Sequence, residues 1–435
     1  MQQEFSKRRR KLMRKMGKNS IAILPTATEK TRNRDCHYLF RADSDFQYLT
    51  GFNEPDAVAV FIPNRKPAQF ILFCRERDPK MELWNGYRAG LQGAIDQYGA
   101  DDAFPINDIS EILPGLLENC SRIFYDMGAH EHFDLQLIGW VNQLNQHSRS
   151  GVETPQTFTT LSTHLHEMRL IKSPAEIKCM RKAANISAQA HCNAMLACQP
   201  DMMEYEIEAE LLYTFKQHGC QTAYNSIVGS GKNSCILHYT ENNAKLNTGD
   251  LLLIDAGAEL DGYASDITRT FPVNGQFSTE QAAIYNIVLN AQLAAIQEIK
   301  PGITWDTPHN TAIAYITEGL IKLGLLKGNK NKLIRDKAYD KFYMHRTGHW
   351  LGLDVHDVGK YKINNKWRRF ESGMVLTVEP GIYIQPNSKG IAKKWWNIGI
   401  RIEDDILVTP TGYEVLSKDA PKTITDIESL MSLAT

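Results

Sequence analysis

The sequence predicts two domains of different class: an α/β domain over residues 1–170 and an α+β domain over residues 171–435. In the first part, short apolar runs alternate with helix-like stretches, which is the pattern of an α/β layer. The second part opens with a clear helix start and carries long amphipathic runs, so we expect helices covering a curved sheet. With 435 residues, 43% of them hydrophobic, the chain can build two sizeable cores.

Three short strands are expected in the first domain, each a run of mostly apolar residues. They are Ser20–Leu24, Ala57–Ile62 and Gln69–Phe73. The basic run Ser6–Lys11 precedes them and could belong to an organelle-targeting or nucleic-acid-binding segment. However, apolar residues fall at helical spacing around it, so we expect a first structural helix with a solvated basic face. Those apolar residues are Phe5, Leu12, Met13 and Met16.

The second domain begins with a strongly predicted helix. Ser173 is placed as the N-cap, Pro174 as the first helical residue, and Glu176 as the partner in a capping box. An amphipathic run follows to about Cys198. Further helices are expected over residues 204–218 and 281–299.

Two aspartates are predicted to meet on one face of a hairpin. A buried-strand run ends in Asp255, and the Asp-Gly pair at 261–262 is a strong signal for a two-residue turn. That turn sets Asp255 opposite Thr268 in a second strand over residues 263–273, with Asp266 as its diagonal neighbour, about 7–8 Å away. Ordinary aspartates on a solvent-facing sheet are the alternative. Two like charges there would weaken the sheet, whereas a metal ion between them would make a site.

A second pair of carboxylates stands in two further apolar runs. Glu379 ends one of them and is followed by Pro-Gly. In the other, residues 399–403, strict alternation puts two isoleucines on one face of a strand and Arg401 with Glu403 on the other. A surface strand would explain Arg401 and Glu403. It would not explain Glu379, because a carboxylate is costly to bury alone.

Histidine enters through His345, His349 and His356, which fall within twelve positions among Gly and Trp. A single core histidine is usually just a hydrogen-bonded residue, but such a cluster is more typical of a site. Spacing alone does not say which of the three binds a metal. Four carboxylates and one imidazole suit a pair of divalent cations, so the pattern predicts a metallohydrolase.

These residues resemble the pita-bread metallopeptidases, and within them the aminopeptidase P (Xaa-Pro aminopeptidase) family. The resemblance rests on Asp-x10-Asp followed by His, Glu and Glu, and on the strings HRTGHWLGLDVHD, TVEPGIYI and GIRIEDDI. It extends to SDFQYLTGFNEPDA (44–57), HEMRLIKSPAEI (166–177) and VGSGKNSCILHYTEN (228–242), and so covers nearly the whole chain.

The resemblance implies a pita-bread fold for residues 171–435, a curved antiparallel sheet covered by helices. It implies that residues 1–170 serve oligomerisation and form a wall of the cleft. The implied metal ligands are Asp255 for one ion, Asp266 and Glu403 bridging both ions, and His349 and Glu379 for the other. In the implied substrate site, His238 and His356 hold the substrate and the tetrahedral intermediate, and His345, Tyr383 and Arg401 line the proline pocket.

The implied reaction is hydrolysis of the bond between an N-terminal residue and a following proline. Two cations that share carboxylates lower the pKa of a bridging water, and the resulting hydroxide attacks the scissile carbonyl. Glu379 is expected to move the proton from the water toward the leaving nitrogen. The oxygen-rich ligand set favours a hard ion, so two Mn²⁺ ions are expected, with cobalt or zinc able to substitute in vitro.

Composition limits the partners. Lys plus Arg number 49 against 50 Asp plus Glu, a net charge of −1, so neither nucleic acid nor a membrane surface is expected as a partner. The eight cysteines form no CxxC pair, and no apolar run reaches the roughly 18 residues of a membrane span. We therefore expect a cytoplasmic enzyme acting on peptides. Trp84 and Tyr87 are expected to be exposed, and in the homo-oligomer (dimer or tetramer) that the resemblance implies they would reach a neighbouring active site.

The sequence is compatible with two other functions. A prolidase shares the fold and the ligands but accepts only Xaa-Pro dipeptides; the N-terminal strings favour the aminopeptidase. A non-catalytic peptide-binding protein with the pita-bread fold would be missing ligands, and here all five are present.

Overall fold

The computed structural model describes residues 2–146 and 151–434 and divides the chain into two compact units. Unit 1 is Met1–Met168 and unit 2 is Arg169–Thr435. Unit 1 is α/β and unit 2 is α+β, which confirms the predicted fold classes. None of the helices in the described residues is both long and apolar enough to cross a membrane.

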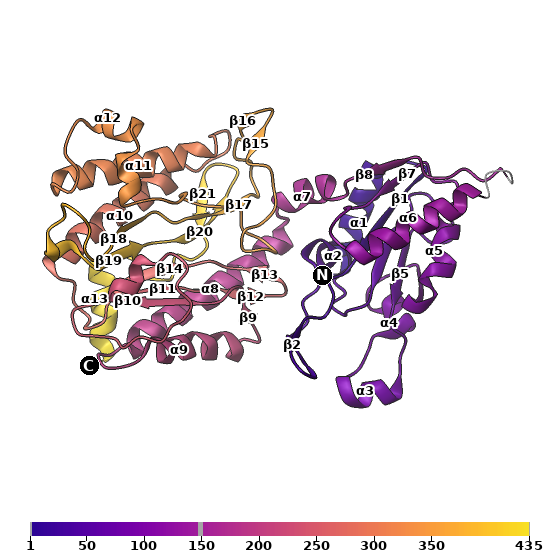
Figure 1. Cartoon of the computed structure of the whole chain (residues 1–435), viewed down its shortest axis with the longest axis horizontal. Helices are drawn as coiled ribbons and strands as arrows, with labels where there is room; N and C mark the ends of the chain where they lie inside the picture. The colour runs from indigo at the N-terminus through magenta and orange to yellow at the C-terminus, as the bar shows by residue number, and fades with distance from the viewer. Residues whose placement is uncertain (1, 147–150, 435) are drawn as a thin grey trace. The chain divides into compact units, whose positions relative to one another are not determined.

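Unit 1 contains a six-stranded sheet in the order β6-β5-β4-β1-β7-β8 (Figure 1). Its strands are β1 (Ser20–Pro25), β4 (Val58–Phe61), β5 (Phe70–Cys74), β6 (Asp102–Pro105), β7 (Arg122–Phe124) and β8 (Thr157–Thr159). The sheet is mixed, because β1 pairs antiparallel with β4 and parallel with β7. The three predicted strands are confirmed as β1, β4 and β5, each within one residue at either end.

Helices surround this sheet. They are α1 (Gln2–Met16), α2 (Ser44–Thr50), α3 (Pro79–Asn85), α4 (Gly90–Asp96), α5 (Ile109–Leu117), α6 (Glu131–Gln146) and α7 (Ser162–Leu170), with a small β2–β3 hairpin (Thr31–Asn33 and Cys36–His37). Ile21 and Ile23, on one face of β1, pack in a core with Leu113 of α5 and Trp140 of α6. The alternation of strand side chains therefore decides which face α5 and α6 cover.

The basic segment forms the structural helix α1, but the prediction of a solvated basic face is wrong for two of its arginines. Arg8 and Arg9 are buried, and each donates a hydrogen bond of 3.0 Å to a backbone carbonyl, that of Tyr48 or Leu49. The Arg8 guanidinium also lies 4.2 Å from the centre of the Tyr48 ring. A long arginine stem can be buried when its head group is satisfied in this way, which apolar spacing alone does not reveal.

Unit 2 is built from antiparallel strand pairs and long helices. Its helices are α8 (Pro174–Ala197), α9 (Glu204–Gln217), α10 (Thr279–Gln297), α11 (Asp306–Lys322), α12 (Lys330–Arg335) and α13 (Ile424–Met431). Its strands are β9 (Gln221–Thr222), β10 (Ile227–Ser230), β11 (Leu251–Asp255), β12 (Ala258–Leu260), β13 (Tyr263–Ala264), β14 (Thr268–Pro272), β15 (Lys362–Ile363), β16 (Lys366–Trp367), β17 (Val375–Val378), β18 (Gly381–Ile384), β19 (Ile398–Arg401), β20 (Asp404–Val408) and β21 (Tyr413–Val415). They form the ladders β10-β11-β14, β13-β12-β9, β17-β20-β21, β18-β19 and β15-β16.

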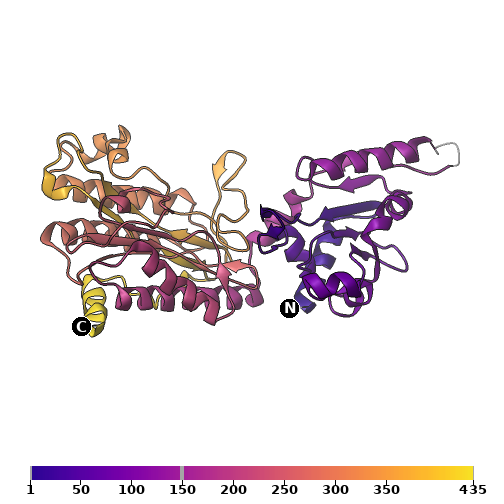
Figure 2. The ribbon, with the colours of Figure 1, turned by 60° about the horizontal axis from the view of Figure 1, so that its bottom comes forward.

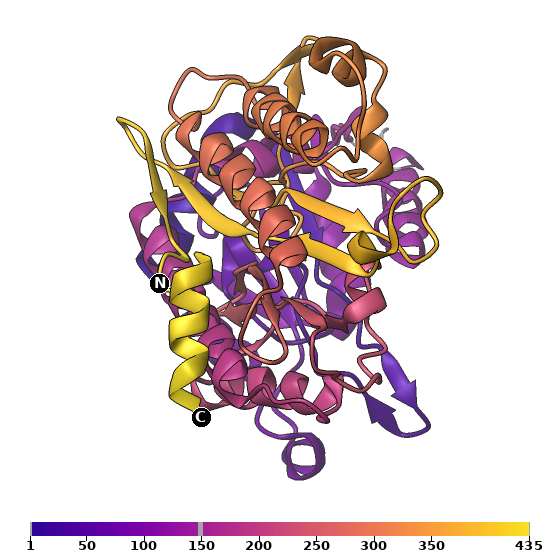
Figure 3. The same cartoon turned by 90° about the vertical axis from the view of Figure 1, so that its left-hand side faces the viewer.

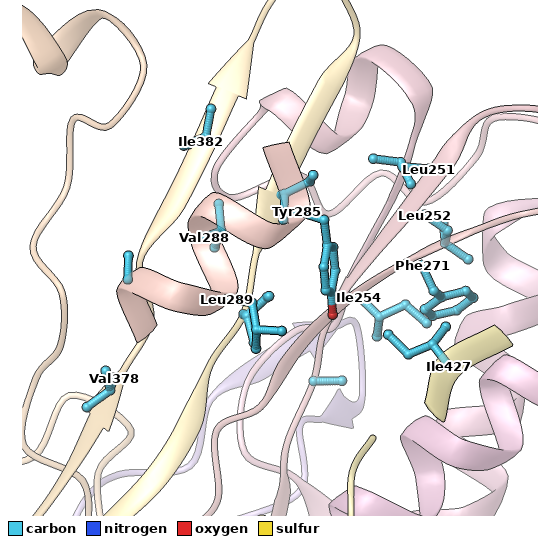
Figure 4. Close-up of a cluster of buried hydrophobic side chains, with 14 of the residues drawn as sticks. Leu251, Leu252, Ile254, Phe271, Tyr285, Val288, Leu289, Val378, Ile382 and Ile427 are labelled. Carbon is cyan, nitrogen blue, oxygen red and sulfur yellow. The ribbon is translucent and has the colours of Figure 1, made fainter. Parts of the chain in front are cut away.

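The helices of unit 2 lie outside its strands. In Figures 2 and 3, α8 and α9 (magenta) and α10 and α11 (salmon to orange) flank the strands. Figure 4 shows Tyr285, Val288 and Leu289 of α10 facing Ile254 of β11 and Ile382 of β18. All of these side chains belong to one continuous buried cluster, so the strands that carry the polar residues described below rest on a packed core.

Helix α8 starts as predicted. The Ser173 side chain accepts from the backbone N–H of Glu176, and the Glu176 side chain accepts from the backbone N–H of Ser173. Pro174 occupies the first turn, where its missing N–H costs nothing. The two other predicted helices are α9 and α10.

The predicted hairpin register is confirmed, because Leu260 pairs with Tyr263 and Asp255 with Thr268. The expected continuous strand over residues 263–273 is wrong, since the chain leaves the ladder at residues 265–267, between β13 and β14. There the backbone N–H of Asp266 donates to the carboxylate of Asp405 (3.2 Å) instead of to a neighbouring strand. The run 399–403 is interrupted in the same way between β19 and β20.

Candidate functional site

A cleft of ≈ 550 Å³ in unit 2 collects the predicted site residues. Nine of the ten line it: His238, Asp255, Asp266, His345, His349, His356, Glu379, Arg401 and Glu403. The tenth, Tyr383, lies behind the wall, where its hydroxyl is 2.9 Å from Nε2 of His345 and accepts from Nη1 of Arg401 (3.1 Å). Distant parts of the chain thus meet in one cavity, at the ends and breaks of strands.

The carboxylates stand where strands stop. Asp255 is the last residue of β11, and Glu379 follows β17 directly. Asp266 and Glu403 occupy the two interruptions, between β13 and β14 and between β19 and β20. A residue at such a break can turn its side chain into the cleft while the adjoining strands keep their ladders.

Three of these residues form a cluster with the spacing of metal ligands. Asp266, His349 and Glu403 each offer one ligand atom, and these atoms lie within 4.8 Å of one another. Nε2 of His349 is 3.3 Å from Oδ2 of Asp266 and 3.6 Å from Oε1 of Glu379. Glu379 therefore stands beside the cluster, on the His349 side.

A tyrosine hydroxyl connects Asp255 to this cluster. The Tyr224 hydroxyl is 2.6 Å from Oδ1 of Asp255 and 2.6 Å from Oδ1 of Asp266. A hydroxyl carries one proton, so it can donate to only one of these carboxylates at a time. Arg401 donates from Nη2 to the other oxygen of Asp255 (2.6 Å). Asp255 and Asp266 are therefore joined by one hydroxyl, with the Arg401 guanidinium beside them.

The pKa values of the site residues also favour a bound cation. Burial raises the pKa of Glu379 to about 7, although His349 and Arg401 oppose the shift. Burial and the charges of neighbouring carboxylates raise the pKa of Glu403 well above its usual range. Burial alone would lower the pKa of His349, but the hydrogen bond to Asp266 and the charge of Glu379 raise it to about 9. Burial also raises the pKa of Asp255, whereas the hydrogen bond from His349 outweighs burial and lowers the pKa of Asp266. Three of the four carboxylates thus hold their charge poorly without further positive charge, and this donor set fits divalent metal ions.

Residues around the ligands fix their orientation. The Thr268 hydroxyl donates to Oε2 of Glu403 (2.6 Å) and accepts from Nε of Arg401 (3.0 Å). Buried Arg269 donates to the Glu403 carbonyl (2.6 Å) and pairs with Asp404 (2.7 Å). Such partners hold ligands in place and usually matter nearly as much as the ligands themselves.

The histidines differ in their surroundings. Burial and the charge of Arg401 lower the pKa of His345 to about 3, so its imidazole stays neutral. The ring of His356 meets that of His349 edge-on, with 4.2 Å between ring centres. His238 and His356 are exposed toward the cleft, which leaves their ring nitrogens accessible to a ligand.

Sequence reasoning missed several residues of this site. Tyr224 belongs to no motif and stands far before Asp255, so no signal marks it. Thr268 could have been found, because the predicted register already set it opposite Asp255. An aromatic wall was also missed. Trp305, Tyr361 and Trp367 line the cleft, and Trp305 packs against buried Trp350 with 4.1 Å between ring centres.

Comparisons with known proteins cover the whole chain. Residues 178–410 match metallopeptidase family M24, and residues 5–125 match the aminopeptidase P N-terminal domain. The Xaa-Pro aminopeptidase of Haemophilus influenzae is 45% identical over 431 residues, covering 99% of this chain and 97% of the relative.

Two solved structures extend the likeness to the fold. The structure of the Pseudomonas aeruginosa aminopeptidase PepP has a TM-score of 0.99 at 55% identity and covers 100% of this chain and 98% of its own. A zinc-substituted Escherichia coli aminopeptidase P in complex with product has a TM-score of 0.97 at 43% identity, covering 100% and 99%.

Proposed function

This chain belongs to metallopeptidase family M24 and is a metal-dependent aminopeptidase that cleaves before a proline in second position; from that premise we propose which residues carry the reaction. Its C-terminal domain has the pita-bread fold, and an aminopeptidase P N-terminal domain precedes it. One observation supports the assignment of the site above all: Asp266, His349 and Glu403 converge in a cleft that Asp255 and Glu379 also line.

We propose that two divalent ions, manganese in the native enzyme, are held by Asp255, Asp266, His349, Glu379 and Glu403. Asp266 and Glu403 would serve both ions; with His349 they form a cluster whose ligand atoms lie within 4.8 Å of one another. When bound, the ions lower the pKa of water and polarise the scissile carbonyl. The mostly carboxylate donor set supports a hard ion such as manganese.

Glu379 is the residue we assign to proton transfer. It lines the cleft, 3.6 Å from Nε2 of His349, and in the metal-free protein burial raises its pKa to about 7. The bond before a proline is a tertiary amide, so its nitrogen carries no hydrogen. This nitrogen needs a proton when the bond breaks. Glu379 takes a proton from the attacking water and delivers it to that nitrogen.

The remaining polar residues hold the substrate. His238 and His356 face the cleft and donate to the substrate carbonyl and the oxyanion that develops from it. Neutral His345, the Arg401 guanidinium and Tyr383 behind them form one hydrogen-bonded wall, which we assign to the proline pocket. A preformed pocket that fits the pyrrolidine ring would favour the tertiary amide that many peptidases cannot accommodate.

We further propose a cytoplasmic homo-oligomer, a dimer or tetramer, formed through the N-terminal domain. All eight cysteines are free, as suits a reducing compartment. Trp84 and Tyr87 are 83% and 89% exposed on unit 1, and large exposed aromatics often mark an interface. Light scattering should give a mass above that of one chain; a monomer at all concentrations would contradict this part of the proposal.

The prolidase alternative is not favoured, because the relatives that match over nearly their full length are aminopeptidases. The deciding experiment compares an Xaa-Pro-Xaa tripeptide with an Xaa-Pro dipeptide, with manganese and again after chelation. The aminopeptidase releases the first residue from the tripeptide in a manganese-dependent manner. Cleavage of the dipeptide alone would make the enzyme a prolidase, and cleavage of neither would revive a non-catalytic binding protein.

A further inference from the structure

His356 sits on a loop that is closed by its own backbone. The N–H of Asp357 donates to the Trp350 carbonyl (2.8 Å), and the N–H of Gly352 donates to the Asp354 carbonyl (3.1 Å). The loop therefore turns back toward its start, beside His349. The position of the His356 imidazole depends on whatever anchors residue 357, the next residue along the chain.

Two basic side chains anchor Asp357. Nη2 of Arg169 donates to Oδ1 of Asp357 (2.6 Å), and Nζ of Lys172 donates to Oδ2 (2.8 Å). Nη2 of Arg169 also donates to Oδ2 of Asp354 (2.7 Å), which lies in the same loop, two residues before His356. Both oxygens of the Asp357 carboxylate thus have a cationic donor, from outside the cleft.

This cluster is almost inaccessible to solvent. The side chains of Asp357 and Lys172 are each 1% exposed, and that of Arg169 is 3% exposed. The positive charges of Lys172 and Arg169 outweigh burial and lower the pKa of Asp357, which therefore stays ionised. Removing one partner from such a set leaves an uncompensated buried charge, so the arrangement has little freedom to change.

The loop is closely packed against this ion cluster. A Cβ on Gly352 would lie 2.2 Å from Oδ2 of Asp357 and 3.0 Å from Cε of Lys172. Lys172 directly precedes Ser173, the N-cap of α8. Its backbone N–H donates to the Gly373 carbonyl (2.8 Å), which holds the residue in place. The ion cluster and the loop of His356 are therefore packed directly against each other.

We propose that Arg169 and Lys172 are positioning residues for the reaction: by clamping Asp357, they fix the loop that presents His356 to the cleft. The inference rests on the proposed function only for the role of His356. It assigns a part in the reaction to two side chains that do not line the cavity.

The test is a double-mutant cycle between Lys172→Met and His356→Ala, measured as kcat and KM on an Xaa-Pro-Xaa tripeptide. Methionine keeps the length and apolar stem of Lys172 while removing its charge. We expect Lys172→Met to lower kcat about tenfold with KM nearly unchanged, and to have less than about a twofold effect when His356 is already alanine. Bound manganese, measured by elemental analysis, should equal that of the parent enzyme.

Arg181→Met is the matched control. Arg181 makes a two-bond ion pair with Glu414 (2.8 and 2.9 Å) in the same unit, about 40% exposed and away from the cleft residues. It should leave kcat unchanged. Where Lys172→Met fails to fold, Asp357→Asn enters the same cycle, because the isosteric carboxamide removes the charge and replaces one of the two acceptor oxygens by a donor.

The outcomes separate this inference from the proposed function. If His356→Ala is slow and Lys172→Met lowers kcat by the same factor in both backgrounds, Lys172 acts only through general stability, and the positioning role is wrong while the proposed function stands. If His356→Ala keeps full kcat, the role assigned to His356 fails, and the positioning role fails with it.

Discussion

Asp255 and Asp266 share one tyrosine hydroxyl, since Oη of Tyr224 lies 2.6 Å from Oδ1 of each. The two carboxylates belong to β11 and to the break before β14, so the hydroxyl connects the two halves of the proposed metal site. Burial, together with the nearby carboxylates, raises the pKa of Tyr224 well above its usual value. The hydroxyl therefore stays protonated and orients the two carboxylates as a hydrogen-bond donor.

Tyr224→Phe should weaken metal binding without unfolding the chain. The ring remains, but the pair of aspartates loses the one hydroxyl that joins them, and loss of such a partner costs about 10–100-fold in metal affinity. Manganese titration followed by activity measures the change. Tyr213→Phe is the control, because Tyr213 is 61% exposed on α9 and its hydroxyl accepts a hydrogen bond from the nearby Gln217 side chain (2.7 Å). Equal manganese affinity in Tyr224→Phe and the parent would exclude the role.

Thr268→Val should destabilise the Glu403 side of the site. Valine has the shape of threonine but leaves Glu403 without a donor and Nε of Arg401 without an acceptor. Each buried group left unsatisfied costs about 1–3 kcal/mol. Chemical denaturation of the metal-free protein measures the loss, and Thr268→Ser should restore most of it because the hydroxyl returns. A valine variant as stable as the parent would show that these contacts contribute nothing.

His356→Ala should retain its manganese and lose turnover. The side chain lines the cleft without belonging to the proposed ligand set, so its loss removes one donor to the developing oxyanion. Such a donor is worth about 10²–10³ in kcat. His132→Ala, an exposed histidine of unit 1, is the control and should behave like the parent. Loss of manganese from His356→Ala would instead make His356 a ligand.

The stability of the enzyme should fall on mild acidification, in part through His191. This side chain is fully buried, and burial lowers its pKa to about 4, whereas an unfolded histidine titrates near 6.5. Between these values the unfolded chain binds a proton that the folded chain does not. The stabilisation is therefore complete above about pH 6.5 and is lost as the pH falls toward 4.

A pH series of unfolding free energies for the parent and His191→Gln isolates this effect. The parent should lose stability relative to the variant by up to about 1.4 kcal/mol per pH unit inside the window. Other histidines with lowered pKa values, such as His309 and His345, titrate in both proteins and cancel in the difference. Parallel curves for the two proteins would contradict the assignment.

The sequence predicted the parts of the site that obey simple periodicity. The Asp-Gly turn at 261–262 and two-residue alternation set the hairpin register, which put Asp255 opposite Thr268. Carboxylates in apolar runs marked the four acidic residues because burying them is costly. The helix start at Ser173 followed from local capping chemistry alone.

The breaks in the strands could not be predicted in this way. At Asp266 the backbone turns to the Asp405 side chain, and at Glu403 the N–H donates to the Thr268 carbonyl (3.1 Å). Both bonds join segments far apart in sequence, so no local pattern reports them. The same holds for Tyr224 and for the clamp on Asp357, since each depends on a contact that exists only after the chain has folded.

Manganese content of Asp266→Ala, measured beside its activity, tests the proposed metal centre most directly. Asp266 is assigned to both ions and its carboxylate lies 3.3 Å from Nε2 of His349, so its loss should disrupt the whole centre. After reconstitution, elemental analysis should find two manganese ions in each parent chain. The variant should hold clearly less manganese and have no measurable aminopeptidase activity. Parent-like manganese content with activity intact would contradict the ligand assignment.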